Sequence, residues 1–155
     1  MGAGKTLVGA LVAQRANARF FDLDTMVEDK AGMSIAELFA THSEEAFRAY
    51  EKETLPSVLK PGAVVALGGG VVIDDDNWRL VRDNAMSVYL EVPFAVLWER
   101  IRYFHMRPLI QNRPASEVEE LLEQRRPRYE QATYRLDGTR PPGELADEVL
   151  KLWSD

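Results

Sequence analysis

The sequence of 155 residues contains no cysteine. Without a thiol, the chain has no disulfide, no thiolate metal site and no cysteine nucleophile. Positive charge is also scarce, because 19 Lys and Arg residues stand against 25 Asp and Glu residues, for a formal net charge of -6 at pH 7. An acidic chain has no general attraction to phosphate backbones or anionic lipid, so we expect neither a nucleic acid polymer nor a membrane as partner.

Long apolar runs are absent as well. No stretch approaches the roughly 20 apolar residues of a membrane span, and the first residues do not show the charged and apolar regions of a secretory signal. With 46% hydrophobic residues, the composition is typical of one globular domain. We therefore expect a single cytoplasmic domain over residues 1–155. We also expect a monomer.

Short apolar runs alternate with helical patterns along the chain. The run at 63–67 is continuous, as expected of a strand buried on both faces. Ser34 and Glu37 form a capping box, and Asp74 and Pro93 each mark a further helix start. Strands are expected over residues 19–21, 63–67, 87–92 and 134–136, and other helices over residues 6–16, 44–59, 117–131 and 143–153. This order predicts an α/β fold, a parallel sheet flanked by helices.

The segment Gly2-Ala3-Gly4-Lys5-Thr6 matches the second half of a P-loop. In that motif the glycine N–H groups and the following helix N-terminus wrap phosphate oxygens. Lys5 would reach the β and γ phosphates, and Thr6 would ligate a Mg²⁺ that bridges those oxygens. The alternative is a glycine-containing terminus that binds nothing. The motif predicts ATP and Mg²⁺ as cofactors, with Gly2, Ala3, Gly4, Lys5 and Thr6 holding the nucleotide.

The first glycine of this motif, and the strand that normally precedes it, do not occur within the sequence, which begins at Met1. In a P-loop fold that strand is central, so its two neighbours would be left with unpaired backbone groups. We expect a domain that lacks its first strand and is poorly stable alone. Our hypothesis is that Met1 is an internal methionine of a longer natural chain; the alternative is a truncated relative with weak or no ATP turnover.

Polar residues and glycines follow two of the expected strands. Asp22 and Asp24 lie two residues apart at a strand end, so they point to different faces and suit different tasks, although Asp24 could instead be a helix N-cap. A glycine triplet follows residue 67 and would let backbone N–H groups approach a ligand where any Cβ would clash. A flexible connection is the alternative for the triplet.

Two arginines are candidates for anion binding. Arg48 has a guanidinium suited to a carboxylate, and the alternative is a surface arginine paired with Glu44 or Glu51 at helical spacing. Arg107 lies in the segment 105–115, which holds two prolines and few apolar positions. We expect that segment to be a mobile loop over a site.

Seven blocks of the sequence, taken in order, resemble the shikimate kinase family. They are Gly2-Ala3-Gly4-Lys5-Thr6, Phe21-Asp22-Leu23-Asp24, Ser34-Ile35-Ala36-Glu37-Leu38-Phe39, Glu45-Ala46-Phe47-Arg48, Leu67-Gly68-Gly69-Gly70, Arg107-Pro108-Leu109 and Arg125-Arg126-Pro127-Arg128-Tyr129. The resemblance covers nearly the whole chain. It implies a P-loop, nucleoside-monophosphate-kinase-like fold with a mobile lid at about 105–115, and phosphorylation of the shikimate 3-hydroxyl by ATP.

The resemblance also implies roles for individual residues. Asp22 would hold Mg²⁺ through water, and Asp24 would bind the acceptor hydroxyls and take the proton of the attacking oxygen. Lys5, Asp24 and Arg107 are the implied catalytic residues, since the lid arginine offsets charge on the transferring phosphate. The implied substrate ligands are Asp24, Arg48, Gly68, Gly69, Gly70 and Arg125, and the implied adenine-site residues are Arg100, Arg140 and Pro142.

Two other functions fit the same sequence. One is a related kinase for a different small hydroxy acid such as gluconate, because Arg48 and Arg125 do not by themselves select one acid. The other is a shikimate-kinase-like binding protein without catalysis. A substrate screen that follows ATP consumption distinguishes a kinase for another hydroxy acid from a shikimate kinase. Absence of ATP binding would favour the binding protein without catalysis.

Overall fold

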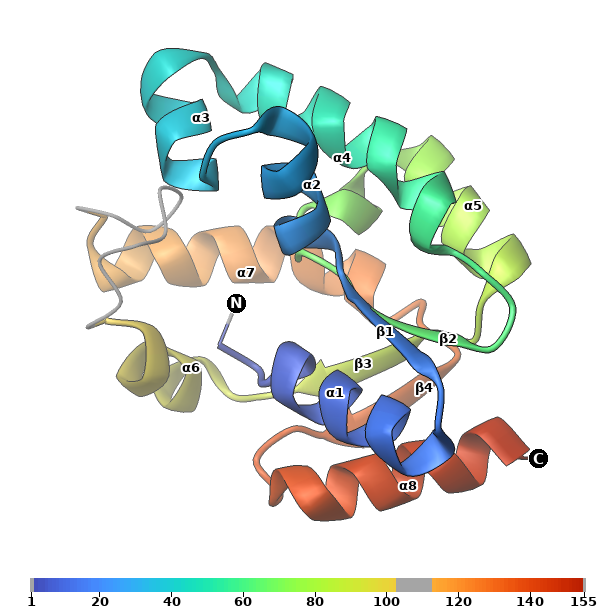
Figure 1. Ribbon diagram of the computed structural model, residues 1–155. Helices are drawn as coiled ribbons and strands as arrows, with labels where there is room; N and C mark the ends of the chain where they lie inside the picture. The colour runs from blue at the N-terminus through green and yellow to red at the C-terminus, as the bar shows by residue number, and fades with distance from the viewer. Residues whose placement is uncertain (1, 103–112, 155) are drawn as a thin grey trace.

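Helices and strands alternate along the chain in the computed structural model, which describes residues 2–102 and 113–154 (Figure 1). The expected α/β class is confirmed. Arg107 and most of the expected lid lie outside the described residues. The elements are α1 Lys5–Ala16, β1 Arg19–Asp22, α2 Leu23–Ala31, α3 Ile35–Thr41, α4 Glu44–Val58, β2 Ala63–Ala66, the 3-10 helix η1 Val71–Ile73, α5 Asp75–Asn84, β3 Val88–Glu91, α6 Phe94–Ile101, α7 Ala115–Tyr129, β4 Tyr134–Asp137 and α8 Pro142–Ser154.

Local hydrogen bonds explain where several helices begin. The capping box predicted for Ser34 and Glu37 is present at the start of α3. Asp74 caps α5 by accepting from two backbone N–H groups. At α2 the N-cap is Asp22, whose Oδ1 accepts from the N–H of Asp24 at 3.1 Å. The alternative of an N-cap at Asp24 is therefore wrong, because β1 ends at Asp22 and the helix begins immediately after it.

Several helix boundaries differ by one or two residues from those expected. Helix α4 passes through Pro56 and ends at Val58, while α7 begins at Ala115, two residues before the expected start. Pro93 occupies the N-cap position of α6 and not its first turn. At a helix start a proline's fixed φ angle suits the turn and its missing N–H costs no helical bond, whereas Pro56 in the last turn of α4 cannot donate to the carbonyl four residues earlier.

The strands form two separate parallel pairs. β1 pairs with β2 from Arg19↔Ala63 to Asp22↔Ala66, and β3 pairs with β4 from Val88↔Tyr134 to Glu91↔Asp137. Within the described residues no pairing joins β2 to β3, so the parallel sheet is divided, as expected above for a sheet without its first strand. A cavity of about 360 Å³ lies between the pairs. Residues 63–65 of β2, expected to be buried on both faces, are only half-buried because they border this cavity.

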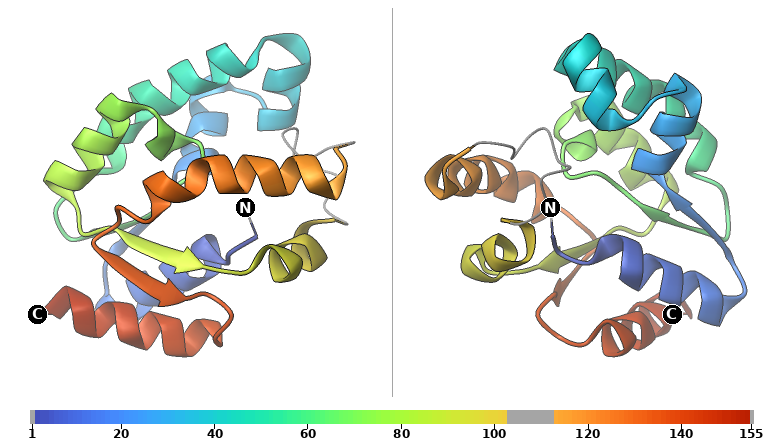
Figure 2. Two further views of the ribbon diagram at one scale, coloured as in Figure 1. Left: turned by 180° about the vertical axis from the view of Figure 1, so that it is seen from behind. Right: turned by 60° about the vertical axis from the view of Figure 1, so that its left-hand side comes forward.

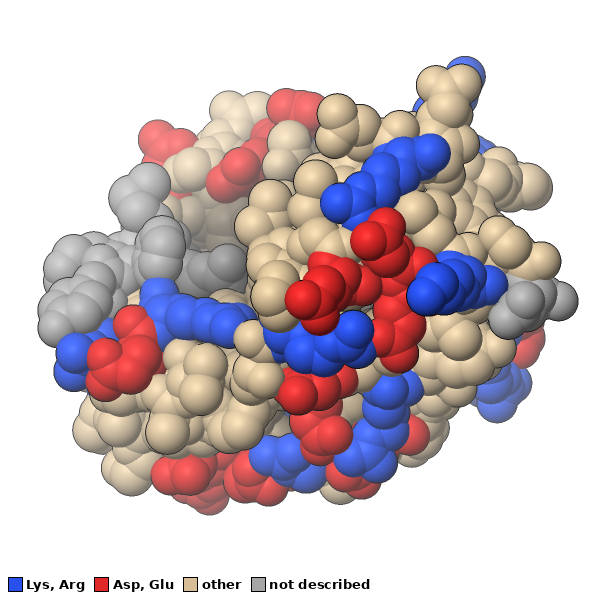
Figure 3. Space-filling view, turned by 90° about the horizontal axis from the view of Figure 1, so that it is seen from below, with Lys and Arg blue, Asp and Glu red and all other residues tan. Residues whose placement is uncertain are grey.

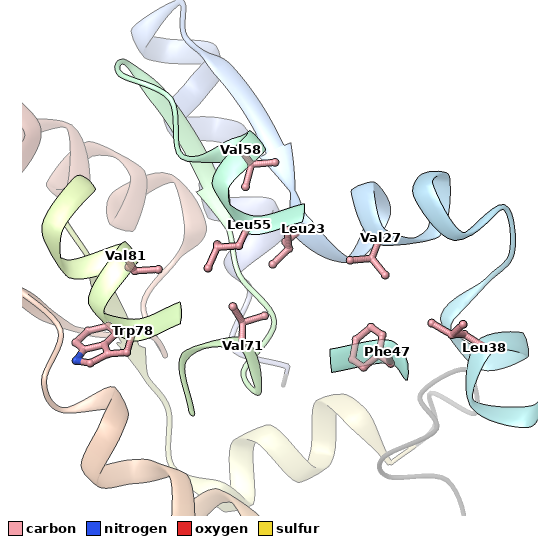
Figure 4. Close-up of a cluster of buried hydrophobic side chains, with 9 residues drawn as sticks. All are labelled: Leu23, Val27, Leu38, Phe47, Leu55, Val58, Val71, Trp78 and Val81. Carbon is pink, nitrogen blue, oxygen red and sulfur yellow. The ribbon is translucent and has the colours of Figure 1, made fainter. Parts of the chain in front are cut away.

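One hydrophobic cluster holds the helices that follow β1 and β2. It includes Leu23 and Val27 of α2 and Leu55 of α4, each fully buried. Figure 4 shows these side chains converging with others from α3, η1 and α5. Because full burial of one Leu or Val side chain stabilises a fold by about 1.5–3 kcal/mol, this cluster fixes α2 and α4 against each other and thereby the ends of β1 and β2.

A second cluster lies around α1. Val8 and Val12 of α1 pack with Leu90 of β3 and with Leu145 and Ala146 of α8. Figures 1 and 2 show α2 to α5 beside the β1–β2 pair on one side of the molecule and α8 on the other, next to α1. Helix α1 also contacts β1 and β2, so it connects the two strand pairs.

Charged side chains on the α8 side of the molecule pair with one another. Arg15 of α1 donates to Asp147 at 2.6 Å and to the carbonyl of Gly143 at 2.7 Å. Seen from that side, basic and acidic residues are interleaved (Figure 3), so they form no large patch of one sign there. Across the described chain, no helix combines the length and apolar character that spanning a membrane would need.

Candidate active site

The segment before α1 forms a loop shaped by glycine, the phosphate loop Gly2, Ala3 and Gly4. Gly2 and Gly4 have φ angles of 64° and 88°, which residues with a Cβ rarely adopt. Gly4 is the N-cap of α1 and offers no side chain to cap it. The first N–H groups of α1 and the half-buried Lys5 are thus placed where an anion can bind. Arg100 of α6 donates to the carbonyl of Gly2 at 3.1 Å.

Thr6 and Asp22 meet beside this loop. The Thr6 hydroxyl, in the first turn of α1, donates to Oδ2 of Asp22 at 2.6 Å. The other oxygen of Asp22 caps α2, so its carboxylate is held in one orientation. A hydroxyl and a carboxylate this close fit Mg²⁺, which prefers oxygen ligands and completes its shell with water and substrate phosphates.

The glycine loop Gly68, Gly69 and Gly70 follows β2 and lies between two carboxylates. A Cβ added at Gly68 would be 3.0 Å from Oδ1 of Asp24 and 3.3 Å from Oε1 of Glu51. The backbone can approach these side chains so closely only because glycine is present. Asp24 is half-buried at the start of α2, and Glu51 is 1% exposed on α4.

Arg48 of α4 lies against the same loop. It donates to Oε2 of Glu51 at 2.5 Å and to Oε1 of Glu44 at 3.1 Å, so the ion pairs expected from helical spacing do form. A Cβ added at Gly70 would overlap the Arg48 guanidinium. Arg48 is therefore not an ordinary surface arginine. Burial acts to lower its pKa, but attraction and hydrogen bonds from Glu51 and Glu44 outweigh it and raise the pKa above its usual range.

Helix α7 meets the glycine loop from another direction. The Tyr129 hydroxyl donates to the carbonyl of Gly69 at 2.8 Å. A Cβ added at Gly69 would lie 2.7 Å from that hydroxyl and 3.8 Å from Nη1 of Arg125. Burial raises the pKa of Tyr129, against the opposing effect of Arg125. The glycine loop thus brings Arg125 of α7 into the neighbourhood of Arg48 of α4.

The structure does not bring all three residues of the implied adenine site together at the phosphate loop. Arg100 contacts the phosphate loop. Arg140 instead binds Glu148 and Glu144 of α8, and the contacts of the described residues do not connect it to the phosphate loop. Pro142 is the exposed first residue of α8. The adenine-site assignment of Arg140 and Pro142 therefore has no contact in its favour in this structure.

Two residues of the site, Glu51 and Tyr129, were not assigned a functional role from the sequence. The sequence indicates Glu51 only as a surface ion-pair partner of Arg48, and Tyr129 only as part of a family block. The signal for Glu51 was its position three residues after Arg48, which places both on one face of α4. Burial is the main reason that the pKa of Glu51 is raised to about 7, with Arg48 opposing the rise and Asp24 adding to it.

The raised pKa of Glu51 predicts a pH dependence of stability. Between its ordinary value of 4.5 and about 7, the folded chain binds more protons at Glu51 than the unfolded chain does. The free energy of unfolding therefore falls as pH rises through this window, by on the order of 3 kcal/mol in total. Urea unfolding at a series of pH values from 4.5 to 8 measures this change in the free energy of unfolding. Glu51→Gln should flatten the profile, whereas Glu45→Gln, on an exposed part of α4, should not; equal slopes in all three proteins would contradict the assignment.

Comparison with known proteins finds one consistent family. A family model described as Shikimate kinase matches residues 1–153. A shikimate kinase of Aromatoleum aromaticum is 40% identical over 155 residues, covering 97% of this chain and 89% of the relative. The crystal structure of shikimate kinase from Aquifex aeolicus superposes with a TM-score of 0.88 at 32% identity, over 99% of this chain and 92% of that one. Shikimate kinase from Acinetobacter baumannii in complex with shikimate superposes with a TM-score of 0.94 at 31% identity, over 99% and 88%.

Proposed function

The chain belongs to the shikimate kinase family, and on that premise we propose that it transfers the terminal phosphoryl group of ATP to the 3-hydroxyl of shikimate. The products are shikimate 3-phosphate and ADP. One observation carries the proposal: the glycine loop gathers Asp24, Arg48 and Arg125 from three helices at the carboxyl end of β2. A carboxylate beside two guanidiniums can bind both the hydroxyls and the carboxylate of such an acid.

The nucleotide side of the site is built from α1 and the phosphate loop. The N–H groups of the phosphate loop and of the first turn of α1 would bind the phosphates, and Lys5 would place its ammonium against the β and γ phosphates. Arg100, through its bond to the Gly2 carbonyl, would hold the loop in shape. These groups offset negative charge where the phosphoryl group transfers, which is the main way that such enzymes lower the barrier.

Thr6 and Asp22 are the residues that would hold Mg²⁺. When bound, the ion supplies positive charge at the β and γ phosphate oxygens during transfer. The 2.6 Å contact between the Thr6 hydroxyl and the Asp22 carboxylate supports this assignment, because it places one neutral and one anionic oxygen side by side at the end of the phosphate loop.

The acceptor would be fixed by its carboxylate and activated at its hydroxyl. Arg48 and Arg125 would bind the carboxylate, with Glu51 and Glu44 orienting Arg48 before substrate arrives. Asp24 would take the hydroxyl proton as the oxygen bonds to the γ phosphorus and the bond from that phosphorus to the bridging oxygen of ADP breaks. Arg107, outside the described residues, is proposed to offset the charge of the transferring group.

We also propose where and how the protein works. Its need for ATP as phosphoryl donor supports action in the cytoplasm. The residues proposed above to hold substrate and nucleotide lie close to one another within one chain, so a single chain can form the site, which supports a monomer as the working unit. The mass of the protein in solution, measured with and without ATP, tests whether the working unit is a monomer.

An assay with defined acceptors tests the function directly. The chain is incubated with ATP, Mg²⁺ and either shikimate or gluconate, and ³¹P NMR identifies any new phosphomonoester. A phosphomonoester formed with shikimate and not with gluconate is the expected result. ATP hydrolysis without a phosphorylated acceptor would contradict the proposal, and phosphorylation of gluconate alone would assign the other substrate.

Replacing Tyr129 by phenylalanine tests the support of the glycine loop. The change removes the 2.8 Å hydrogen bond to the Gly69 carbonyl and leaves that carbonyl without its partner. We expect a loss of about 1 kcal/mol in the free energy of unfolding and a rise in the KM for shikimate of roughly 5-fold. The control is Tyr134→Phe, on β4. A KM unchanged in Tyr129→Phe would show that the loop does not depend on this bond.

A further inference from the structure

The glycine loop continues directly into η1, a single turn of three residues. Two hydrogen bonds close this turn: the N–H of Val71 donates to the carbonyl of Gly68 at 3.3 Å, and the N–H of Ile73 donates to that of Gly70 at 3.2 Å. Both distances are at or beyond the upper end of the usual range of about 2.7–3.2 Å, and short 3-10 turns have poor hydrogen-bond geometry in general. The turn therefore needs support from other elements to hold the glycine loop in one conformation.

Asn77 of α5 gives η1 this support from inside the protein. Its side-chain amide donates to the carbonyl of Val71 at 3.1 Å, and Asn77 is buried. Its backbone N–H donates to Oδ1 of Asp74 at 2.9 Å, so both ends of Asn77 are held. The hydrophobic cluster of Figure 4 fixes the Val71 side chain, and the bond from Asn77 fixes its carbonyl as well. A buried amide is costly unless it is hydrogen-bonded, so this bond accounts for an Asn at a position inside the fold.

A hydrogen bond to a carbonyl also orients the N–H group of the following residue. In a trans peptide the two groups lie in one plane and point in opposite directions, and the described part of the chain has no cis peptide bond. Asn77 thus sets the peptide plane after Val71, as the Tyr129 hydroxyl sets the plane after Gly69. The loop and its turn are held from two helices, α5 and α7.

The start of α5 is itself joined to the two helices that carry the proposed substrate arginines. Lys52 of α4 lies 2.9 Å from Asp76 and 3.4 Å from Asp74, and Arg128 of α7 pairs with Asp75. Lys52 and the three carboxylates are exposed at their side chains, so each ion pair contributes little. Leaving a buried carbonyl without its donor costs more than losing an exposed ion pair, so the amide bond from α5 is the connection with the largest effect on the loop.

We propose that Asn77 is a positioning residue for the acceptor. By holding the Val71 carbonyl it fixes η1, and it thereby sets the glycine loop against Arg48 and Arg125 in the arrangement that binds the acceptor. This role rests on the proposed function, because it concerns the acceptor half of that site. The hydrogen bonds of Asn77 are to Val71 and Asp74, whereas the nucleotide is proposed to bind at α1 and the phosphate loop, so the affinity for ATP should not depend on Asn77.

Two substitutions of Asn77 in the full chain test this proposal. Asn77→Leu keeps nearly the same size without a donor, and the side chain of Asn77→Asp, ionised at pH 8, accepts hydrogen bonds but cannot donate one to a carbonyl. Asn84→Leu is the matched control, because Asn84 is the last residue of the same helix and donates its amide to the carbonyl of Leu80 at 2.9 Å. Steady-state kinetics with each substrate varied, urea unfolding and hydrogen exchange at the amides of residues 71–73 are measured for the three variants and the wild type.

Both Asn77 variants should raise the KM for shikimate by roughly 10-fold and leave the KM for ATP within about twofold of wild type. Exchange at the amides of Val71 and Ile73 should become roughly 10-fold faster relative to amides of α1. Asn84→Leu should change neither KM and should not speed exchange at residues 71–73. If Asn77→Leu does not fold, which urea unfolding shows, Asn77→Asp decides the result, because an acidic residue is favourable in the first turn of a helix.

Three results would overturn the proposal. They are a folded Asn77 variant that matches Asn84→Leu in every measurement, faster exchange with an unchanged KM for shikimate, and equal rises in the KM values of both substrates. The second would reduce Asn77 to a structural role. Failure of the wild-type chain to phosphorylate shikimate would count against the proposed function instead, and exchange at residues 71–73, which needs no substrate, would still test whether Asn77 holds the loop.

Discussion

Arg48→Ala is expected to lower kcat/KM for shikimate by roughly 100-fold while leaving the affinity for ATP nearly unchanged. The loss corresponds to about 3 kcal/mol, a typical value for removing one charged partner from a hydrogen-bonded site. Arg48 lies against the glycine loop and its hydrogen bonds are to Glu51 and Glu44, whereas the phosphates and Mg²⁺ are proposed to bind at Thr6 and Asp22. Steady-state kinetics with each substrate varied, together with ATP titration calorimetry, measure the effect.

The same substitution also leaves Glu51 buried without its nearest cation, so a loss of folding could imitate a loss of binding. Arg48→Ala combined with Glu51→Gln removes that buried charge and should recover stability but not shikimate binding. Arg79→Ala is the matched control, since Arg79 is an exposed arginine that pairs with Asp76 on α5. Wild-type kcat/KM in the stable double variant would remove Arg48 from the substrate site.

Features that depend on neighbouring residues were predictable from the sequence. The capping box of Ser34 and Glu37 and the acidic start of α5 at Asp74 are both found in the structure, because each is a contact across two or three residues. The N-cap of α2 was not predictable in the same way. It depends on where β1 ends, and β1 ends at Asp22 because pairing with β2 ends at Ala66.

The parts of the site that the sequence could not specify depend on contacts between distant segments. Glu51 shows a helical spacing to Arg48, but its burial depends on segments distant in sequence, among them Gly68, which lies close to its carboxylate. Tyr129 reaches Gly69 across 60 positions of sequence. The missing strand before Gly2 predicts unpaired edges on its two neighbours, whereas the apolar run 63–67 gives no sign of them, because its pattern is the same whether its second edge meets a strand or a cavity.

Asp24→Asn is expected to reduce kcat by roughly 100- to 1000-fold, with little change in the KM for ATP. An amide keeps the size and can still bind hydroxyls of the acceptor, but it cannot take a proton, and a positioned general base contributes about 10²- to 10⁴-fold to such reactions. Asp24 also raises the pKa of Glu51, so the same variant should shift the pH dependence of unfolding to lower pH. Kinetics and urea unfolding over pH 4.5 to 8 provide two independent measurements on one protein.

The control for Asp24→Asn is Asp29→Asn, because Asp29 is exposed on the same helix. It loses the same charge from α2 without touching the glycine loop, and both kcat and the unfolding profile should stay at wild-type values. Kinetics and urea unfolding of Asp24→Asn test two separate statements: that Asp24 lies beside Glu51, and that Asp24 is the general base. A shifted unfolding profile with kcat within about twofold of wild type would place Asp24 beside Glu51 but exclude it as the base. A lowered kcat with an unshifted pH dependence of unfolding would support Asp24 as the base. It would disprove the coupling between the carboxylates of Asp24 and Glu51.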